Sequence, residues 1–347
     1  MSSGSVSIEA PASRSLGGIA CVVVGMMFFV VQDALMKLLL GDFTIWMLIL
    51  ARSAIAVLVL VPLILYLGAP HRLLSPLWPL HLTRAALFAF GFALFYAAFP
   101  FMGLAEVTTI FFSAPLLTAL IAAIFLGEKI GVHRTASLGV GFAGVVIAMN
   151  PTGDTFQWVA ILPLITAATY AASQVIARRV GDRKTSLTLG LYTIALAGVL
   201  LLPASYALNE ALVLGPEFRH LRWDWSLPGD NLWIVPVIGV VGMIGYILIS
   251  RAYQIADAGI VAPFDYTYLP LAALMAYALW DETPEWTTIA GMVLIIGSGL
   301  YLGYRELMQT RRVLEPTPTA EIVFTPGAPI GAIAHTSDAS DDNPTGR

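Results

Sequence analysis

Four charged side chains interrupt stretches that are otherwise long and apolar: Asp33, Lys37, Arg52 and Asp265. A charge at the centre of a membrane span costs about 3 kcal/mol, so such residues usually face the bundle interior or a watery cavity. Asp33 and Lys37 lie four residues apart on one helical face. Counted at about 1.5 Å per residue, Asp33 and Arg52 lie at similar depths. We expect either a structural ion pair, Asp33 with Arg52 or with Lys37, or a cavity-facing Asp33 or Arg52 that contacts a charged group or a proton.

Asp265 lies between Pro263 and Pro270 inside another apolar stretch. Proline removes a backbone donor and kinks a helix, and broken helices near the membrane midplane are where transporters bind substrate. We therefore expect kinks at both prolines and an Asp265 that lines a cavity. The alternative is a structural ion pair with Arg84 or Arg251 near the inner side.

Uncharged polar and aromatic side chains inside the apolar stretches add further candidates for solute contact. A buried phenol needs a partner or water, and aromatic rings together with acids suit a solute with a flat ring and a positive charge. Ser113 lies beside Pro115, which predicts one more kink. Trp46 lies near a stretch end and fits the aromatic belt of a membrane surface. The candidates of this kind are Gln32, Tyr96, Ser113, Tyr170, Gln174 and Tyr266.

The composition of the chain identifies the class of protein that holds these residues. Of 347 residues, 58% are hydrophobic and only 12% are charged, whereas soluble domains carry about 25% charged residues. This excludes an ordinary soluble enzyme and indicates a polytopic protein whose partner is the lipid bilayer. A net charge of −4 gives no basic surface for nucleic acid. The single cysteine, Cys21, and the absence of H-E-x-x-H, G-x-S-x-G and G-x-x-x-x-G-K-[ST] motifs predict no metal, no cofactor and no ATP-driven pump.

We predict an all-α integral membrane protein with ten transmembrane helices. A span needs about 20 mostly apolar residues, and the runs are too long and too continuously apolar for barrel strands. The break at Gly103 is the least distinct of those between runs. The predicted spans are 16–40, 44–66, 80–102, 104–126, 131–149, 157–179, 186–208, 232–253, 258–280 and 286–304.

The Lys and Arg residues predict the orientation, because cytoplasmic loops carry an excess of them. With the N-terminus inside, the outer loops hold only Arg219 and Arg222. We therefore expect both termini to be cytoplasmic, with tails at 1–15 and 305–347, the second of them disordered. The inner segments hold Arg14, Arg72, Arg84, Lys129, Arg134, Arg178, Arg179, Arg183, Lys184, Arg251, Arg305, Arg311, Arg312 and Arg347.

The sequence also contains a weak internal repeat, which divides it at residues 16–149 and 157–304. Each copy has a small residue followed by an acid, a proline inside a span, an acid at that span's end (Glu128 or Glu282) and a glycine-spaced helix. Both span-end acids are expected to have gating or structural partners rather than to contact solute. Since each copy holds five spans, the second copy is inverted. Inverted repeats are typical of transporters that work by alternating access.

Five short patterns accompany this repeat. They are Pro115-x12-Glu128, the glycines of the fifth span (Gly139, Gly141, Gly144), the start of the ninth (Ala256, Pro263, Phe264), the opening Asp33-Ala34-Leu35-Met36-Lys37 and the closing 299–306. Together they resemble the EamA-type transporters of the drug/metabolite transporter superfamily over roughly 16–306. The resemblance implies two inverted five-helix bundles, a central cavity reached from one side at a time, and a bacterial-type inner (plasma) membrane location. The pattern Asp33-Ala34-Leu35-Met36-Lys37 is most similar to that of bacterial members linked with S-adenosylmethionine or riboflavin uptake.

These observations predict a secondary transporter of a small organic metabolite, driven by a proton gradient, by exchange or by downhill flow. The solute would be cationic or aromatic, like S-adenosylmethionine or riboflavin, or an amino acid or drug that is exported. One alternative is an integral membrane enzyme acting on lipid or a lipid-linked sugar, with its site in the outer loop 209–231. Another is a passive channel. A homodimer is one assembly that the sequence allows.

Overall fold

The computed structural model describes residues 11–67, 78–126, 131–151, 158–181, 186–211, 220–222, 232–256 and 258–310. Within these ranges the chain forms helices joined by short turns, and it contains no strand. The long helices are α1 (Pro11–Leu39), α2 (Ile45–Leu67), α3 (Trp78–Ala98), α6 (Val132–Met149), α7 (Ile161–Gly181), α8 (Ser186–Ala211), α9 (Ile234–Ile255) and α12 (Trp286–Thr310). A short 3-10 turn, η1 (Trp158–Ala160), leads into α7.

Two of the predicted spans are built from pieces. The fourth consists of α4 (Leu104–Phe111) and α5 (Ala114–Leu126), and the ninth of α10 (Ala258–Val261), the 3-10 segment η3 (Ala262–Thr267) and α11 (Tyr268–Trp280). Nine helical stretches of the described chain, with α4 and α5 taken together, are long and apolar enough to cross a membrane. The ninth span supplies the tenth crossing, although its longest piece, α11, has only 13 residues. The predicted all-α architecture with ten crossings is therefore present.

The breaks lie at the prolines that the sequence singled out. Pro115 is the second residue of α5 and follows the break at residues 112–113, where the amide of Ser113 donates to the carbonyl of Ile110. Pro263 lies within η3, and Pro270 lies in the first turn of α11. Proline has no amide hydrogen to donate, so it fits a helix best in its first turn or at a break, although Pro62 and Pro203 lie inside α2 and α8.

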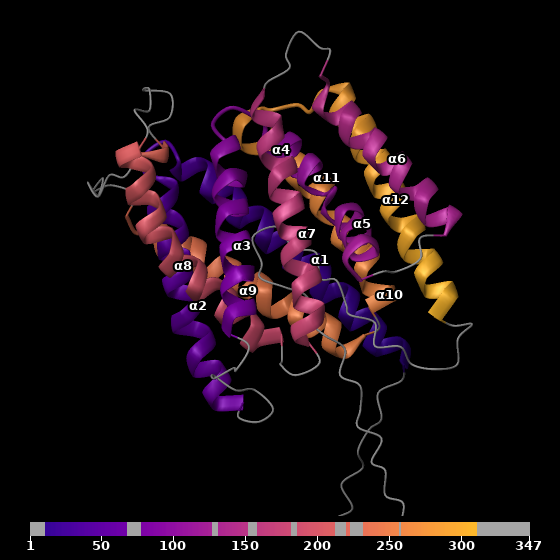
Figure 1. Ribbon diagram of the computed structural model, residues 1–347, viewed down its shortest axis with the longest axis horizontal. Coiled ribbons are helices and arrows are strands. Elements are labelled where there is room, and N and C mark those ends of the chain that lie inside the picture. Colours follow the sequence, from indigo (N-terminus) through magenta and orange to yellow (C-terminus); the bar gives the residue numbers. More distant parts are fainter. Residues whose placement is uncertain are drawn as a thin grey trace, which may run out of the picture.

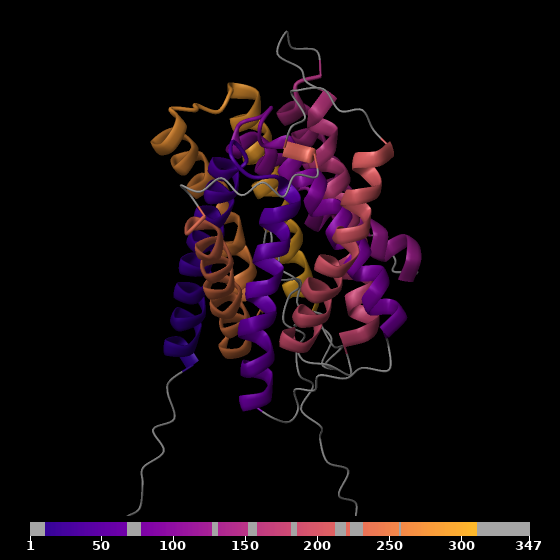
Figure 2. The ribbon, with the colours of Figure 1, turned by 90° about the vertical axis from the view of Figure 1, so that its left-hand side faces the viewer.

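The bundle has two ends that differ in which connections they hold (Figures 1 and 2). The upper face carries residues 40–44, 99–103 and 281–285, and the lower face carries both ends of the described chain, Pro11 and Thr310. An even number of crossings brings the chain back to the side where it started. The two faces therefore correspond to the two sides of a membrane.

The predicted tails need one correction. α1 begins at Pro11 rather than at residue 16, and α12 continues to Thr310, so residues 305–310 are helical rather than disordered. The apolar run limits how much of a helix lies in lipid, but it does not limit the helix itself. The rest of both tails lies outside the described residues, as do Glu128 and most of the loop 209–231.

The pattern of helix pairing is the one that two inverted repeats produce. Each span of the first half has a counterpart five spans later, so α7 corresponds to α1 and α9 corresponds to α3. The contact of α1 with α9 therefore corresponds to the contact of α7 with α3, and both contacts are present. The pairs α2 with α9 and α3 with α8 correspond in the same way, as do α1 with α11 and α5 with α7. α2 with α8 and α6 with α12 are each made of two counterparts. The helices α6 and α12 lie side by side at one edge of the bundle (Figure 1).

Glycines allow several of these pairs to approach closely. A Cβ added to Gly291 of α12 would collide with the backbone carbonyl of Gly144 of α6. On the lower half of α1, a Cβ on Gly18 would collide with Ala256, and one on Gly25 would collide with Ile249 of α9. Small residues at helix contacts are the usual means of close packing in membranes. The lower halves of α1 and α9 are thus tightly closed against each other.

Candidate functional site

The carboxylate of Asp33 is the centre of a buried cluster of polar side chains. Asp33 lies on α1 and is 0% exposed. Its Oδ1 accepts hydrogen bonds from the hydroxyl of Tyr96 on α3 at 3.0 Å and from Nε2 of Gln32 at 3.2 Å. Its Oδ2 accepts a hydrogen bond from the hydroxyl of Tyr268, the first residue of α11, at 2.6 Å. Helices of both repeats therefore meet at one carboxylate.

Arg52 of α2 joins this cluster through Tyr96 rather than through Asp33. Its Nη1 donates to the Tyr96 hydroxyl at 2.9 Å, and its Cζ lies 5.7 and 5.9 Å from the ring centroids of Tyr96 and Phe92. The described residues contain no direct ion pair between Asp33 and Arg52, so that predicted pair is wrong. The predicted similar depth is nevertheless consistent with one tyrosine bridging the two charges.

Helix α9 holds the amide of Gln32 in place. Gly242 of α9 faces Gln32 so closely that an added Cβ would collide with Oε1 of the amide. Because only hydrogen occupies that position, the Gln32 side chain fits between α1 and α9 and points its nitrogen toward Asp33. We refer to Gln32, Asp33, Arg52, Tyr96 and Tyr268 together as the Asp33 cluster.

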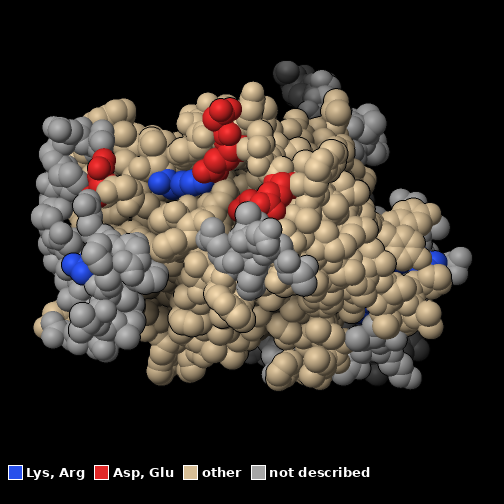
Figure 3. Space-filling model, turned by 90° about the horizontal axis from the view of Figure 1, so that it is seen from above, with Lys and Arg blue, Asp and Glu red and all other residues tan. Residues whose placement is uncertain are grey.

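A hollow of about 500 Å³ opens on the upper face above this cluster. Seen from above, most of that face is uncharged, and acidic side chains gather beside a basic one near its middle (Figure 3). Lys37, one helical turn from Asp33 on α1, is part of the lining, so the Asp33 cluster lies just beneath the hollow. The lining residues are Lys37, Leu40, Gly41, Phe99, Pro100, Phe101, Met102, Gly103, Ala105, Glu106, Ala276, Trp280, Glu282, Thr283 and Pro284.

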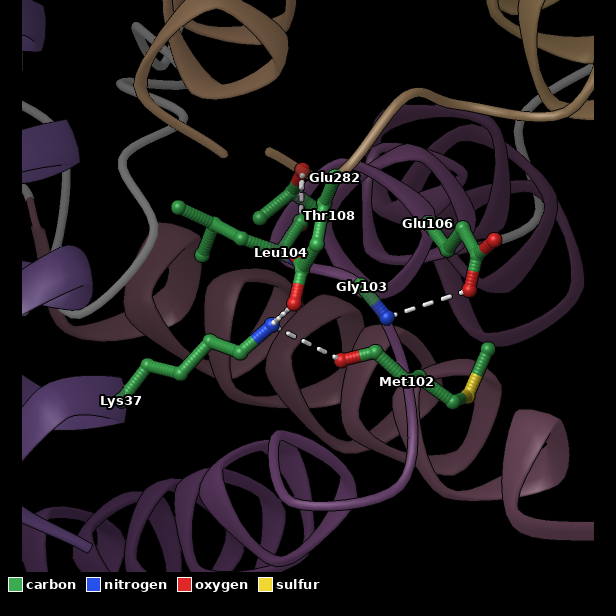
Figure 4. A network of polar contacts seen from close by, with 7 residues as sticks. All are labelled: Lys37, Met102, Gly103, Leu104, Glu106, Thr108 and Glu282. Carbon is green, nitrogen blue, oxygen red and sulfur yellow. Dashed lines mark hydrogen bonds and ion pairs between the residues drawn. The ribbon is translucent and has the colours of Figure 1, made fainter. Parts of the chain in front are cut away.

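An ion pair crosses the wall of the hollow (Figure 4). Nζ of Lys37 lies 2.5 Å from Oε1 of Glu282, donates to the carbonyl of Met102 at 3.3 Å, and lies 4.9 Å from the ring centroid of Trp280. The predicted pairing of Lys37 with Asp33 is therefore wrong. The reason is that Glu282, two residues past the end of α11, comes within reach of the ammonium group, whereas the acid one turn away does not.

The same carboxylate also fixes the start of α4 (Figure 4). Oε2 of Glu282 accepts from the amide of Leu104 at 3.3 Å, and Oε2 of Glu106 accepts from the amide of Gly103 at 3.1 Å. Thr108 donates its hydroxyl to the carbonyl of Leu104. Acids at a helix N-terminus satisfy its unpaired amides. Glu282 thereby links α1, α4 and the turn after α11.

Asp265 lies in the lower part of the bundle, away from the Asp33 cluster. It is 3% exposed, and its Oδ2 accepts a hydrogen bond from the hydroxyl of Tyr253 of α9 at 2.8 Å. The predicted ion pair with Arg84 or Arg251 is wrong, because Arg251 is exposed and Arg84 bonds to α7. The neighbouring Tyr266 packs its hydroxyl against Gly299 of α12.

The remaining candidates also lie outside the Asp33 cluster. On α7, Nε2 of Gln174 donates to the Tyr170 hydroxyl at 2.9 Å. Ser113 is 0% exposed at the break between α4 and α5. The ring of Phe92 lies 6.2 Å from those of both Tyr96 and Tyr170, so an aromatic layer separates the upper and lower polar groups.

Sequence reasoning misread three residues. Tyr268 is not among the candidates that the sequence singles out, yet it makes the shortest hydrogen bond to Asp33. Arg84 was counted among the inner basic residues, yet it is 0% exposed within α3. Trp46 was assigned to the lipid belt, yet it is 5% exposed, and its Nε1 donates to the carbonyl of Leu221 at 2.7 Å. The position of Pro270 close after Tyr268 was the one sequence signal that marked the first of them.

In the part of the chain that the structure describes, no three His, Cys, Asp or Glu side chains come together as metal ligands would. The chemistry of the site is thus that of one carboxylate, one guanidinium, phenols and amides. Such groups can bind and orient a polar solute, and a carboxylate can exchange a proton.

Comparison with known proteins agrees with this arrangement. The model of the EamA-like transporter family matches residues 16–150 and 157–304, one match for each half of the chain. A riboflavin transporter of Vibrio cholerae is 27% identical over 270 residues, which cover 76% of this chain and 84% of the relative. An S-adenosylmethionine uptake transporter of Rickettsia bellii is 26% identical, with 72% and 80% covered. A pseudopaline exporter of Pseudomonas aeruginosa is 26% identical, with 80% and 93% covered.

One solved crystal structure has the same fold. It superposes with a TM-score of 0.55 at 18% sequence identity and covers 88% of this chain and 100% of its own. At that identity the likeness extends to the fold alone. The family match and the sequence relatives carry the information on function.

Proposed function

The chain belongs to the EamA-like transporter family, and from this premise we propose that it moves a small organic solute by alternating access through the Asp33 cluster. The family and the named relatives make the chain a multi-pass membrane transporter of small molecules. The proposal adds the path of the solute, its chemistry and the residues that contact it.

One observation carries the proposal: a fully buried carboxylate lies one helical turn from Lys37, which lines a hollow that is open on the upper face. Within the described residues, the Asp33 carboxylate is bonded only to uncharged donors, namely two phenols and an amide. A buried charge that lacks a direct opposite charge is costly, and it is a strong binding partner for a cation or a proton that reaches it. The hollow supplies the approach.

The lower half supports the alternating part of the proposal. Gly18 and Gly25 pack α1 closely against α9 in the lower half and at the middle of α1, and the hollow opens on the upper face between the upper end of α1, the 99–103 turn, the start of α4 and the end of α11. In inverted repeats, exchanging the two conformations closes one side and opens the other. We infer that the described conformation is the one open to the upper face.

The chemistry of the hollow favours a solute that has a flat ring and carries positive charge. Glu106 and Glu282 contribute two carboxylates against the one ammonium group of Lys37, which pairs with Glu282, and Phe99, Phe101 and Trp280 contribute rings. Rings attract cations through their faces, and acids attract them through charge. Riboflavin and S-adenosylmethionine, the solutes named for the relatives, are therefore the first two compounds to test.

The orientation follows from the distribution of charge. We propose that the lower face, where the described chain begins and ends, is cytoplasmic, because the predicted inner segments hold most of the Lys and Arg residues. The membrane would be the inner membrane of a bacterium. A homodimer remains a prediction, and light scattering of the purified protein measures it.

Transport by the purified full-length protein in sealed vesicles tests the proposal. A thermal-shift screen with riboflavin, S-adenosylmethionine and a metabolite panel first identifies a bound solute, because a ligand of the folded state raises the melting temperature. We expect Asp33→Asn to fold and to lose most uptake of that solute. The matched control is Asp42→Asn, the same substitution at an exposed position on the upper face. Uptake by Asp33→Asn at the wild-type rate would remove Asp33 from the mechanism.

The same variants separate a transporter from a membrane enzyme. An enzyme would need its acids and histidines clustered at one face, and the only such segment in the sequence, loop 209–231, lies mostly outside the described residues. Alanine substitutions at Glu210, Glu217, Asp224 and Asp230 should leave transport largely unchanged. Loss of all activity in those variants would favour the enzyme.

A further inference from the structure

Arg84 is a buried cation with most of its hydrogen-bonding capacity unused. It lies on α3 and is 0% exposed. Its Nε donates to the carbonyl of Ser173 on α7 at 3.2 Å. Among the described residues, neither Nη1 nor Nη2 has a hydrogen-bond partner. A guanidinium has five N–H donors in a rigid fork, so the four on Nη1 and Nη2 remain unsatisfied.

The surroundings do not compensate this charge. No carboxylate of the described chain forms an ion pair with Arg84. The titratable neighbours within electrostatic range are the phenols of Tyr170 on α7 and Tyr246 on α9. A structural buried arginine normally has its fork bonded to carbonyls or a carboxylate, because an unpaired buried charge strongly destabilises the fold. Arg84 has only one such bond.

The position of Arg84 places it on the other side of the aromatic layer from Asp33. It precedes Tyr96 by twelve residues on α3, which corresponds to a separation of about 18 Å along the helix. Polar groups of α7 and α9 lie near it. Ser173 and Gln174 lie on α7 with Tyr170, and Gly190 of α8 leaves room for the Tyr246 hydroxyl, with which an added Cβ would collide. This lower polar group is packed closed while the upper hollow is open.

We propose that Arg84 binds a carboxylate or phosphate group of the transported solute when the lower half of the bundle opens. The planar fork matches both groups through two parallel N–H···O bonds. The phenols of Tyr170 and Tyr246 can donate to the remaining oxygens. The inference rests on the proposed function, since it requires a solute path past Asp33, and it adds that the solute bears an anionic group as well as a positive one.

Arginine-specific chemical labelling tests this without knowledge of the solute. The full-length protein in phosphatidylcholine vesicles is treated with phenylglyoxal, and the modification of each arginine is quantified by mass spectrometry. We expect Arg84 to react, because the lower-open state exposes it. Benzoate or inorganic phosphate should slow that reaction about tenfold at about ten times its dissociation constant. Benzamide, the uncharged counterpart of benzoate, should give no protection.

Each other outcome overturns the proposal. If Arg84 stays unmodified while Arg251 on the exposed surface reacts, no solution path reaches Arg84. If benzamide protects as well as benzoate, or if neither anion protects, the site does not select anions. If phosphatidylglycerol in the vesicles protects while the soluble anions do not, the ligand is a lipid headgroup rather than a solute.

Stability of two variants provides a second, independent measurement. Arg84→Met removes the unpaired charge but keeps much of the side-chain volume, so its melting temperature should equal or exceed that of the wild type. Arg84→Lys keeps the charge but lacks the planar guanidinium group. Both should lose uptake of a solute that carries a carboxylate or phosphate. A large fall in the melting temperature of Arg84→Met would assign Arg84 a structural role. Labelling does not require transport, so the two proposals can fail separately. If Arg84 does not react with phenylglyoxal while Asp33→Asn loses uptake, this inference is contradicted and the proposed function is not.

Discussion

Removing the hydroxyl of Tyr268 tests the geometry of the Asp33 cluster most directly. Tyr268→Phe deletes the 2.6 Å hydrogen bond to Oδ2 of Asp33 and leaves the ring in its stacked contact with Phe112, 5.3 Å between centroids. Hydrogen bonds to charged groups contribute about 2 kcal/mol, and no water can replace the lost donor because both residues are 0% exposed. We expect the free energy of unfolding to fall by about 2 kcal/mol, which lowers the melting temperature by about 3 °C for a chain of this length.

The neighbouring tyrosine gives a matched control. The hydroxyl of Tyr266 packs against Gly299 and makes no hydrogen bond within the described part of the chain. Tyr266→Phe should therefore change stability by less than about 0.5 kcal/mol. Both variants are measured on the full-length protein in one detergent, by intrinsic fluorescence during heating. In an Asp33→Asn background the Tyr268→Phe loss should fall to about 1 kcal/mol, since charge-assisted bonds are about twice as strong as neutral ones.

Two results would refute this reasoning. If Tyr268→Phe and Tyr266→Phe lose equal stability, the loss comes from the rings and not from the bond to Asp33. If the effects of Tyr268→Phe and Asp33→Asn simply add, the two side chains do not interact.

Variants at four other positions follow from contacts described above. Lys37→Met and Glu282→Gln should each lower the free energy of unfolding by about 1 kcal/mol, because the ion pair is partly exposed. The double variant should lose no more than either single variant, which a thermal double-mutant cycle measures. Gly242→Ala should displace Gln32 from Asp33, reducing stability by about 1–3 kcal/mol and lowering uptake in vesicles. Trp46→Phe should lose about 1 kcal/mol in a thermal melt, because it removes the hydrogen bond from Nε1 to a loop carbonyl.

The ion pair and Gly242 each have a control. The swap of Lys37→Glu with Glu282→Lys should recover most of the melting temperature lost by either single change, and strictly additive losses would show that the pair contributes nothing. Gly297→Ala adds a Cβ that meets no atom within 4 Å, so it should raise stability by up to about 1 kcal/mol through helix propensity. If Gly242→Ala behaved like Gly297→Ala, Gln32 would not be held as described.

The sequence predicted which charges matter better than it predicted their partners. Counting residues from span ends gave Asp33 and Arg52 the same depth, and one tyrosine bridges them. Depth does not determine how each helix is rotated about its axis, so the direct ion pair was expected in error. That rotation is set by packing between helices far apart in the chain, which a single sequence does not reveal.

Breaks and burial account for the other errors. The η3 segment changes the rise and rotation of the ninth span, so the direction of Tyr268 could not be counted from either span end. The excess of basic residues on one side predicts the side of the membrane on which they lie, but it says nothing about exposure, and Arg84 was counted with residues of the inner loops for that reason. Trp46 was assigned by its distance from a span end, although a loop packs over it.

Four glycines on α6 and α12 differ in what surrounds them, although they belong to the same pair of packed helices. Gly144 and Gly291 bring backbone against backbone, and backbone atoms have no rotamers with which to yield. Gly139 and Gly297, on the same two helices, have open space where a side chain would begin. A saturation mutagenesis library selected for growth or uptake should therefore keep glycine at the first two positions and accept most residues at the other two. Glycines that look equivalent in the sequence thus differ in how freely each can drift over evolution.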